Sequence, residues 1–222
     1  MPYQPSFPSE RRSPFRIHSE ATPVSDKAVI LIDGGYFDNI DNYAQGEAGG
    51  EIDFYRFSSE LCKEFDCDLL RTKYYNAYPP QDDDPTDDQK EYYASRQRYY
   101  DAINNKRKHQ FVEMGRVRDE HADCPECDKH FTYHSQKGTD VGIAVDLLDM
   151  AYQGTADAFI LVSGDEDMTL AVDRAKEELC NVYVAFATAG YHPYHLYASD
   201  KLTTEADGVI RMDPDWLRDC VS

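Results

Sequence analysis

Aspartates follow two apolar runs at the points where buried strands should end. Residues 28–32 form a continuous apolar run that stops at Asp33, and residues 158–162 form another that stops just before Asp165. Asp167 lies two residues beyond Asp165. Because ligands of parallel α/β sheets bind beyond the carboxyl ends of the strands, we expect these three carboxylates to lie near one another.

A fourth aspartate belongs to the start of a helix. An apolar helical period runs over residues 140–151 and places Asp140 in the first turn, with Thr139 as the expected N-cap. Lys137, just before it, could contact phosphate, although a lone Lys in such a loop is more often a solvated charge. Four carboxylates from three distant segments are therefore predicted to converge, namely Asp33, Asp140, Asp165 and Asp167.

Clustered carboxylates of this kind suit divalent metal chemistry. Mg²⁺ and Mn²⁺ prefer oxygen ligands, and such ions assist the cleavage of phosphodiester bonds without a histidine or serine nucleophile. Each aspartate taken alone is also common in turns and at helix caps. The pattern of two strand-end acids together favours a site that binds Mg²⁺ or Mn²⁺ and is suited to the cleavage of phosphodiester bonds.

The elements that must position these residues alternate along the chain. Helical spacing at residues 54–65 is followed by strand alternation at residues 70–74, and a second helix is expected near residues 92–103. A strand at residues 111–117, another at 182–186, a short helix near Leu202, a strand at 209–212 and a helix start at Asp213-Pro214 follow. This order predicts a single α/β domain with a parallel sheet flanked by helices.

A small Cys/His insertion interrupts that alternation at about residues 119–136, which fit neither a helical nor a strand period. Its ligand types and spacing predict a structural Zn²⁺ site, for which the candidate ligands are Cys124, Cys127, His130 and His134. The final spacing is compressed, so His121 or ligands from a second chain could replace one histidine. The alternative is a reduced or redox-active cysteine pair in a polar loop.

Composition limits the classes of protein. The net charge of −19 argues against a broad basic face for nucleic acid, although acids can hold cations that meet phosphate. No run of about 20 apolar residues and no secretion signal is visible, so we expect a cytoplasmic protein without membrane contact. Residues 1–26 are rich in proline and predict a flexible tail, which leaves residues 27–222 as the folded domain.

The ordered motifs resemble the NYN domains of the PIN-like nuclease superfamily, in particular the LabA-like branch. They are residues 32–37 (IDGGYF), residues 137–140 (KGTD) with Asp146 further along that helix, and residues 163–168 (SGDEDM). The resemblance implies a PIN-like fold and metal-dependent ribonuclease activity, with Asp33, Asp140, Asp165, Asp167 and Asp146 at the acidic positions of the family. Asp207 resembles a late acid of the family, and Tyr36 stands where many relatives have Asn.

Two functions follow from these residues. The first is an endoribonuclease that depends on Mg²⁺ or Mn²⁺, and the second is a non-catalytic regulatory or RNA-binding module with the same fold. The intact aspartates favour the enzyme, whereas Tyr36 and the acidic charge favour the module. RNA is the expected partner in both cases, and a homo-oligomer or a protein partner is also compatible. A dinucleotide-dependent oxidoreductase is set aside because the first strand lacks the G-x-G-x-x-G motif.

Overall fold

The computed structural model describes residues 25–114, 116–123, 127, 129–188 and 196–222. A six-stranded sheet forms its centre, in the order β3-β2-β1-β6-β7-β8, and every neighbouring pair is parallel. The strands are β1 (Asp26–Asp33), β2 (Cys67–Asn76), β3 (His109–Glu113), β6 (Ala158–Val162), β7 (Asn181–Ala187) and β8 (Gly208–Met212). The predicted α/β fold with a parallel sheet is confirmed.

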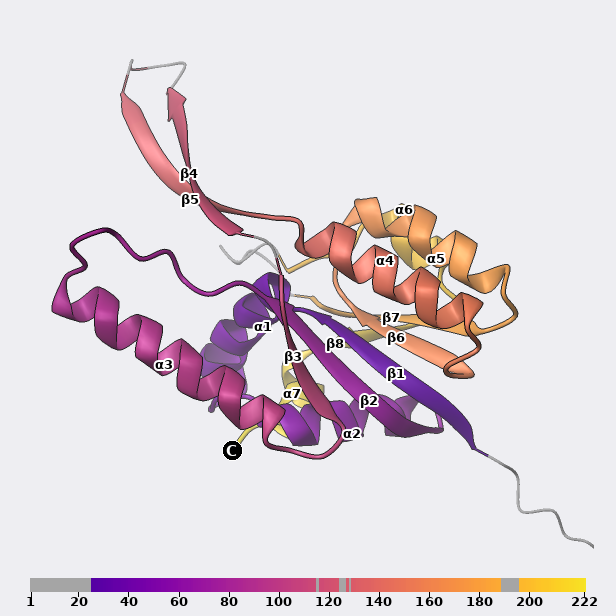
Figure 1. The fold of residues 1–222 in the computed structure, drawn as a ribbon. Helices are drawn as coiled ribbons and strands as arrows, with labels where there is room; N and C mark the ends of the chain where they lie inside the picture. The colour runs from indigo at the N-terminus through magenta and orange to yellow at the C-terminus, as the bar shows by residue number, and fades with distance from the viewer. Residues whose placement is uncertain (1–24, 115, 124–126, 128, 189–195) are drawn as a thin grey trace, which may run out of the picture.

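Helices cover both faces of the sheet (Figure 1). One face carries α1 (Gly34–Glu47), α2 (Phe54–Glu64), α3 (Asp87–Asn104) and α7 (Pro214–Arg218). The other face carries α4 (Thr139–Tyr152), α5 (Thr169–Lys176) and α6 (Asp200–Glu205). Strands buried on both faces read as continuous apolar runs, which explains why β1 and β6 were visible in the sequence.

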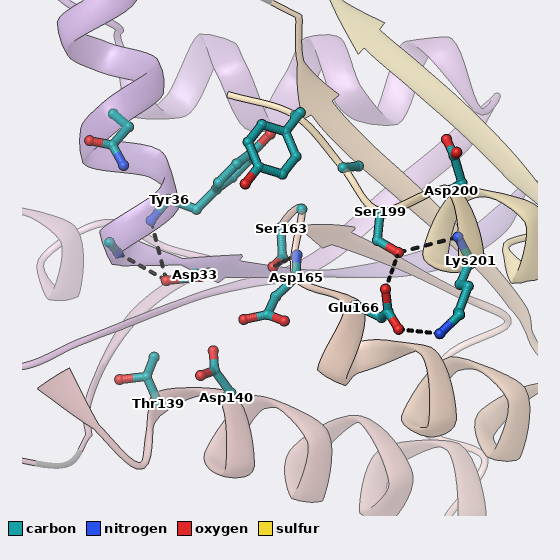
Figure 2. A pocket seen from close by; sticks show the side chains of 15 residues that line it. Asp33, Tyr36, Thr139, Asp140, Ser163, Asp165, Glu166, Ser199, Asp200 and Lys201 are labelled. Carbon is teal, nitrogen blue, oxygen red and sulfur yellow. Dashed lines mark hydrogen bonds and ion pairs between the residues drawn. The ribbon is translucent and has the colours of Figure 1, made fainter. Parts of the chain in front are cut away.

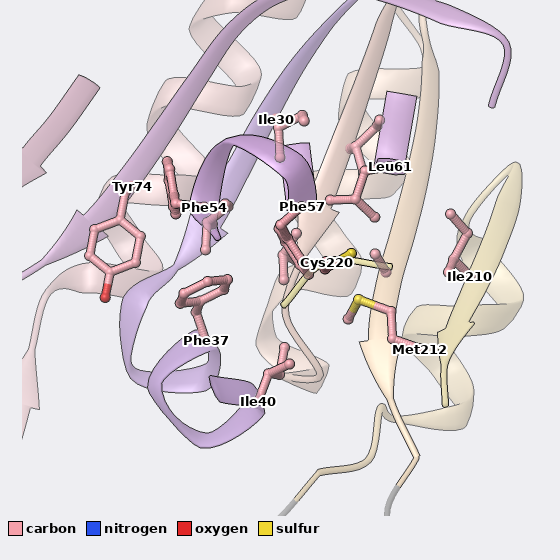
Figure 3. Packing of buried hydrophobic residues seen from close by; sticks show 14 of the residues in the cluster. Ile30, Phe37, Ile40, Phe54, Phe57, Leu61, Tyr74, Ile210, Met212 and Cys220 are labelled. Atoms are coloured by element: carbon pink, nitrogen blue, oxygen red, sulfur yellow. The ribbon is translucent and has the colours of Figure 1, made fainter. Parts of the chain in front are cut away.

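The core divides along the alternation of the strands. Ile30 of β1 packs among Phe37, Phe57 and Leu61 on the face covered by α1 and α2 (Figure 3), whereas Leu31 joins the opposite cluster. The rings of Phe37 and Phe57 meet edge to face, with centroids 5.1 Å apart. Successive side chains of a strand point to opposite faces, so a single apolar run supplies both layers.

Helix α1 is absent from the sequence prediction, which placed the end of a strand at Asp33 and no helix directly after it. The structure instead begins the helix at Gly34, directly after β1. Glycine lowers helix propensity mainly in a helix interior, and both glycines occupy the first turn. The buried positions of α1 that follow include Phe37, Ile40 and Ala44, and this helical spacing was the signal that could have identified it.

Helix α4 begins one residue earlier than predicted. Gly138 is the N-cap residue, and Thr139 is the first helical residue, so the prediction of Thr139 as the N-cap is wrong. Gly138 has a φ of 98°, a conformation that glycine adopts without steric cost. Asp140 lies in the first turn as predicted.

The insertion between β3 and α4 contains an antiparallel hairpin of β4 (Arg116–Asp123) and β5 (His130–Lys137). It extends away from the main sheet (Figure 1). The single strand expected over residues 111–117 is in fact the end of β3 and the start of β4. An isolated hairpin needs no apolar face against the core, which is why its sequence lacks the alternation of a buried strand.

The amino-terminal segment lies mostly outside the described residues. β1 begins at Asp26, one residue inside the segment that was predicted as a tail, and residues 1–24 are outside the described part of the chain. Among the described residues, no helix combines the length and the apolar character needed to span a bilayer.

Candidate active site

The candidate site lies where the strand order reverses. β1 has β2 on one side and β6 on the other, so the connections from β1 and β6 leave in opposite directions around their common edge. Ile32 pairs with Val162, which places Asp33 and Ser163 side by side at the carboxyl ends of the two strands. This is the position at which open α/β sheets bind their ligands.

Asp33 both ends β1 and begins α1. Its Oδ1 accepts hydrogen bonds from the backbone N–H groups of Gly35 at 2.9 Å and Tyr36 at 3.3 Å. Gly34 passes close to the end of β2, where an added Cβ would lie 2.6 Å from the carbonyl oxygen of Tyr75. The tight junction between strand and helix therefore requires glycine at position 34 and fixes the carboxylate of Asp33 at the edge of the sheet.

A cleft of about 900 Å³ opens at this edge. Its lining residues come from α1, α4, the loop after β6 and the segment that leads into α6: Asp33, Gly35, Tyr36, Asn39, Thr139, Asp140, Ser163, Gly164, Asp165, Glu166, Tyr197, Ala198, Ser199, Asp200 and Lys201. Figure 2 shows the carboxylates of Asp140 and Asp165 directed toward one another, with Asp33 beside them. Three of the predicted aspartates thus share one cleft.

Asp167 lies beside the cleft, outside its lining residues. It belongs to the short 3-10 helix Glu166–Met168, and its backbone N–H donates to Oδ1 of Asp165 at 2.9 Å. Its charge nevertheless reaches Asp140, because it contributes to the raised pKa of that carboxyl. Asp167 therefore adds negative potential to the site from its rim.

Burial and electrostatic repulsion both disfavour the charged form of the carboxylates in the cleft. The pKa of Asp33 is raised to about 6, first by burial and then by the charges of Asp140 and Asp165, despite its two backbone hydrogen bonds. Burial also raises the pKa of Asp140, and the charges of Asp165 and Asp167 raise it further. No Lys or Arg in the described part of the chain forms an ion pair with Asp33, Asp140 or Asp165. These carboxylates hold negative charge that a cation would stabilise.

The donors present fit a hard divalent cation in their chemistry. All are carboxylate oxygens, and their mutual repulsion is the property that a bound Mg²⁺ or Mn²⁺ would relieve. Across the described residues, however, no three His, Cys, Asp or Glu side chains already lie close enough to hold one ion directly. The arrangement therefore fits an ion that keeps several of its waters, as Mg²⁺ does with few carboxylate ligands.

Asp146 lies away from the cleft. It projects from α4 toward β2, where it pairs with Nζ of Lys73 and accepts a hydrogen bond of 2.8 Å from the hydroxyl of Tyr75. This places it between α4 and the sheet. Its charge is neutralised there, so it holds α4 in place and does not face the carboxylates of the cleft.

Asp207 lies at the opposite end of the sheet from the cleft. Its Oδ2 accepts a hydrogen bond of 2.8 Å from the backbone N–H of Val182, and its Oδ1 is 3.6 Å from Nζ of Lys176. The carboxylate therefore joins β7 to the start of β8. Its place in the fold is structural.

Tyr36 lines the cleft and connects α1 to the end of β7. Its hydroxyl accepts a hydrogen bond of 3.2 Å from the backbone N–H of Ala187, at the end of β7. Asn39, one helical turn later, lines the same cleft.

The residues that line the cleft opposite α4 were not predicted from the sequence. Glu166, Ser199 and Lys201 form a connected group there, and Asp200 lies beside them. Glu166 belongs to the motif at residues 163–168, but no function was predicted for it. Ser199 and Lys201 were not identified from the sequence. A short helix near Leu202 gives no indication of which of its residues will face a cleft that distant segments form.

The candidate zinc ligands are only partly described. Cys124 and the side chain of His134 lie outside the described part of the chain. Cys127 is exposed, and Nδ1 of His130 pairs with the carboxylate of Asp123 across the hairpin. The zinc site stays a prediction.

The protein is an α/β protein with a parallel sheet and an acidic cleft at the point where the strand order reverses. Comparison with known families identifies the family to which it belongs. The sequence matches the NYN domain over residues 27–213, so the chain belongs to the NYN domain family. That family is part of the PIN-like nuclease superfamily, whose members typically act on RNA and generally use divalent metals. A search of curated proteins gave no match.

A solved structure shares the fold. A protein of unknown function from Vibrio parahaemolyticus is 21% identical and superposes with a TM-score of 0.54, over 90% of this chain and 99% of the other. At this identity the likeness concerns the fold alone. The UDP-GlcNAc 2-epimerase of Methanocaldococcus jannaschii is 10% identical with a TM-score of 0.37, over 83% of this chain and 39% of the enzyme.

Proposed function

We propose that this chain is a metal-dependent endoribonuclease of the LabA-like branch of the NYN family. The observation that supports this most directly is the mutual repulsion of Asp33, Asp140 and Asp165 in one cleft. Carboxylates that only cap helices or close turns need no such proximity. A cluster that is unfavourable without a cation is what a metal-dependent phosphodiesterase requires.

The residues divide into groups with different roles in this proposal. Asp33, Asp140 and Asp165 hold Mg²⁺ or Mn²⁺, and Asp167 strengthens the negative potential from the rim. Divalent ions, when bound, supply Lewis acidity and neutralise charge on a phosphodiester. Asp146 positions α4, and therefore Asp140, through its pairing with Lys73.

A cleavage assay on the purified full chain tests the proposal. Single-stranded and structured RNA would be incubated with Mg²⁺, with Mn²⁺ and with chelator, and the products separated on a denaturing gel. Cleavage should require a metal and should fall by orders of magnitude in Asp165→Asn, comparable with the loss of a principal electrostatic stabiliser at about 3 kcal/mol or more. Full activity of that variant, or cleavage unaffected by chelator, would contradict the mechanism.

A non-catalytic RNA-binding module is the second candidate. The observation that favours it is that, among the described residues, no three donors are already arranged around one ion. Under this alternative the chain binds RNA but leaves it intact with either metal. The same assay, followed by recovery of the bound RNA, separates the two functions.

We also propose that the hairpin insertion binds one structural Zn²⁺ per chain. Cys124, Cys127, His130 and His134 supply thiolate and imidazole donors, which zinc prefers. Elemental analysis of protein prepared without added zinc tests this. Less than about a tenth of an equivalent per chain would reject it, because structural zinc is normally held tightly.

A further inference from the structure

The wall of the cleft formed by α6 and the loop after β6 contains a closed group of side chains. Nζ of Lys201 pairs with Oε1 of Glu166, and the hydroxyl of Ser199 donates to Oε2 of the same carboxylate at 3.2 Å. The backbone N–H of Lys201 in turn donates to the oxygen of Ser199 at 3.2 Å. Figure 2 shows this group beside the aspartates, and we name it the Ser199–Glu166–Lys201 group.

The position of this group relative to Asp165 is fixed by close backbone contact. The N–H of Ser199 donates to the carbonyl oxygen of Gly164 at 3.0 Å. A Cβ at Gly164 would lie only 2.0 Å from the carbonyl oxygen of Tyr197, so the two segments touch where only glycine fits. The segment that carries Lys201 is therefore anchored to the loop that carries Asp165.

Asp165 and Glu166 are adjacent in that loop, and their side chains lie on different sides of the cleft. The carboxylate of Asp165 is directed toward Asp140, whereas that of Glu166 is directed toward Lys201 (Figure 2). Among the described residues that line the cleft, Lys201 supplies the cationic side chain, beside five carboxylates. Its side chain keeps 71% of its surface exposed, so a ligand in the cleft can reach the ammonium group.

An exposed ion pair of this kind is weakly held. Pairs between exposed Lys and Glu side chains typically contribute little stability, because water competes for both groups. A phosphate oxygen can therefore replace Glu166 as the partner of Lys201 at small cost, while the hydroxyl of Ser199 continues to hold Glu166. The cation is in place before the ligand arrives.

We propose that Lys201 forms a subsite for a backbone phosphate of RNA next to the bond that is cleaved, and that Glu166 competes with that phosphate for Lys201. This deepens the proposed function and rests on it. The subsite gives a protein of net charge −19 a local cationic contact for its substrate. Ser199 sets the direction of Glu166 and is a positioning residue.

The test measures binding of a fluorescein-labelled oligouridylate to the full chain in chelator, where no metal-dependent cleavage occurs. Lys201→Met should weaken binding by about three- to tenfold and should lower the slope of log affinity against log salt by about 0.7, the value for one contact with single-stranded RNA. Glu166→Gln should strengthen binding. In the Lys201→Met background, Glu166→Gln should keep only the small gain that follows from removing one negative charge, as measured by Asp200→Asn.

Matched controls separate this inference from general electrostatics. Asp200→Asn removes one charge from the same cleft, and its gain in binding should persist in the Lys201→Met background. Lys63 has an exposed side chain that pairs with Glu60 on α2, outside the lining of the cleft, and Lys63→Met should leave binding unchanged. Additive effects of Glu166→Gln and Lys201→Met, or an unchanged salt slope, would overturn the subsite even if the chain binds and cleaves RNA. Absence of RNA binding by the unsubstituted chain would overturn the proposed function and the subsite together.

Discussion

Aspartates lie at both ends of the central sheet, and their surroundings differ. At the amino ends of the strands, Asp157 accepts a hydrogen bond of 2.9 Å from the backbone N–H of Lys27, and Asp207 accepts one from Val182 beside Lys176. At the carboxyl ends, Asp33 and Asp140 lie near other carboxylates and have raised pKa values. Aspartates at the amino ends connect neighbouring strands through hydrogen bonds, whereas aspartates at the carboxyl ends lie close enough to repel one another.

This difference has a physical origin in the connections of the fold. At the amino ends, each carboxylate meets N–H groups of the neighbouring strand, which stabilise its charged form. At the carboxyl ends, β1 and β6 send their following segments to opposite faces, and the carboxylates face a shared cleft. Among the described residues, the aspartates of the cleft are therefore distinguished by their proximity to one another, and aspartate content alone does not identify them.

The largest expected effect comes from exchanging one carboxylate at each end. Asp140→Asn should lower metal-dependent RNA cleavage by roughly a hundredfold or more, because it removes a charge from the cleft. Asp207→Asn should retain cleavage, since this residue lies far from the cleft. Initial rates with Mn²⁺ at a temperature where both variants are folded provide the measurement. Equal losses in the two variants would remove the distinction between the two ends.

The pH dependence of stability should report the burial of Asp33 and its repulsion by the neighbouring carboxylates. In metal-free protein, the raised pKa of Asp33 stabilises the fold below its unfolded value near 3.8, and this stability is lost as the pH rises through about 6. Asn at this position can still accept the hydrogen bonds from Gly35 and Tyr36. Asp33→Asn should therefore remove the fall and raise the unfolding free energy at pH 7 by about 2 kcal/mol, less than the full shift implies because the cleft meets solvent.

Urea unfolding in chelator between pH 4 and pH 7, on the parent and on Asp33→Asn, measures this effect. A matched variant, Asp157→Asn, controls for a general change in net charge. If Asp33→Asn is less stable than the parent at pH 7, the carboxylate has a stabilising partner and the description of the cleft as repulsive is wrong.

A smaller change of stability, in the opposite direction, is expected for a substitution at the amino ends of the strands. Asp207→Ala leaves the N–H of Val182 without its acceptor and Lys176 with one carboxylate fewer, which should cost about 1–2 kcal/mol of unfolding free energy. Asp207→Asn should recover part of this cost because its amide oxygen can accept the same hydrogen bond. Thermal or urea unfolding measures both variants, and an unchanged Asp207→Ala would contradict a structural role.

The smallest effect concerns the hydrogen bond between Tyr36 of α1 and the end of β7. Tyr36→Phe removes the acceptor for the N–H of Ala187 and should cost about 1 kcal/mol of unfolding free energy. RNA cleavage should change little, since the ring still fills its place. A loss of cleavage without a loss of stability would instead assign the hydroxyl of Tyr36 to the chemistry.

The sequence by itself determined the class of fold and the candidate aspartates. Apolar runs that are buried on both faces identified β1 and β6, and their abrupt ends identified Asp33 and Asp165. Asp140 was predictable because helical periodicity places it in a first turn. These features are local, so short stretches of sequence contain them completely.

Only the tertiary structure decided which acids share a cleft and which have partners of their own. Asp146 belongs to the same motif as Asp140, yet β2 supplies Lys73 and Tyr75 to it from a distant part of the chain. Glu166 and Lys201 meet because α6 packs against the loop after β6. The partner of a charged side chain depends on which segments the sheet order brings together, and the local sequence that determines a strand end contains no record of that order.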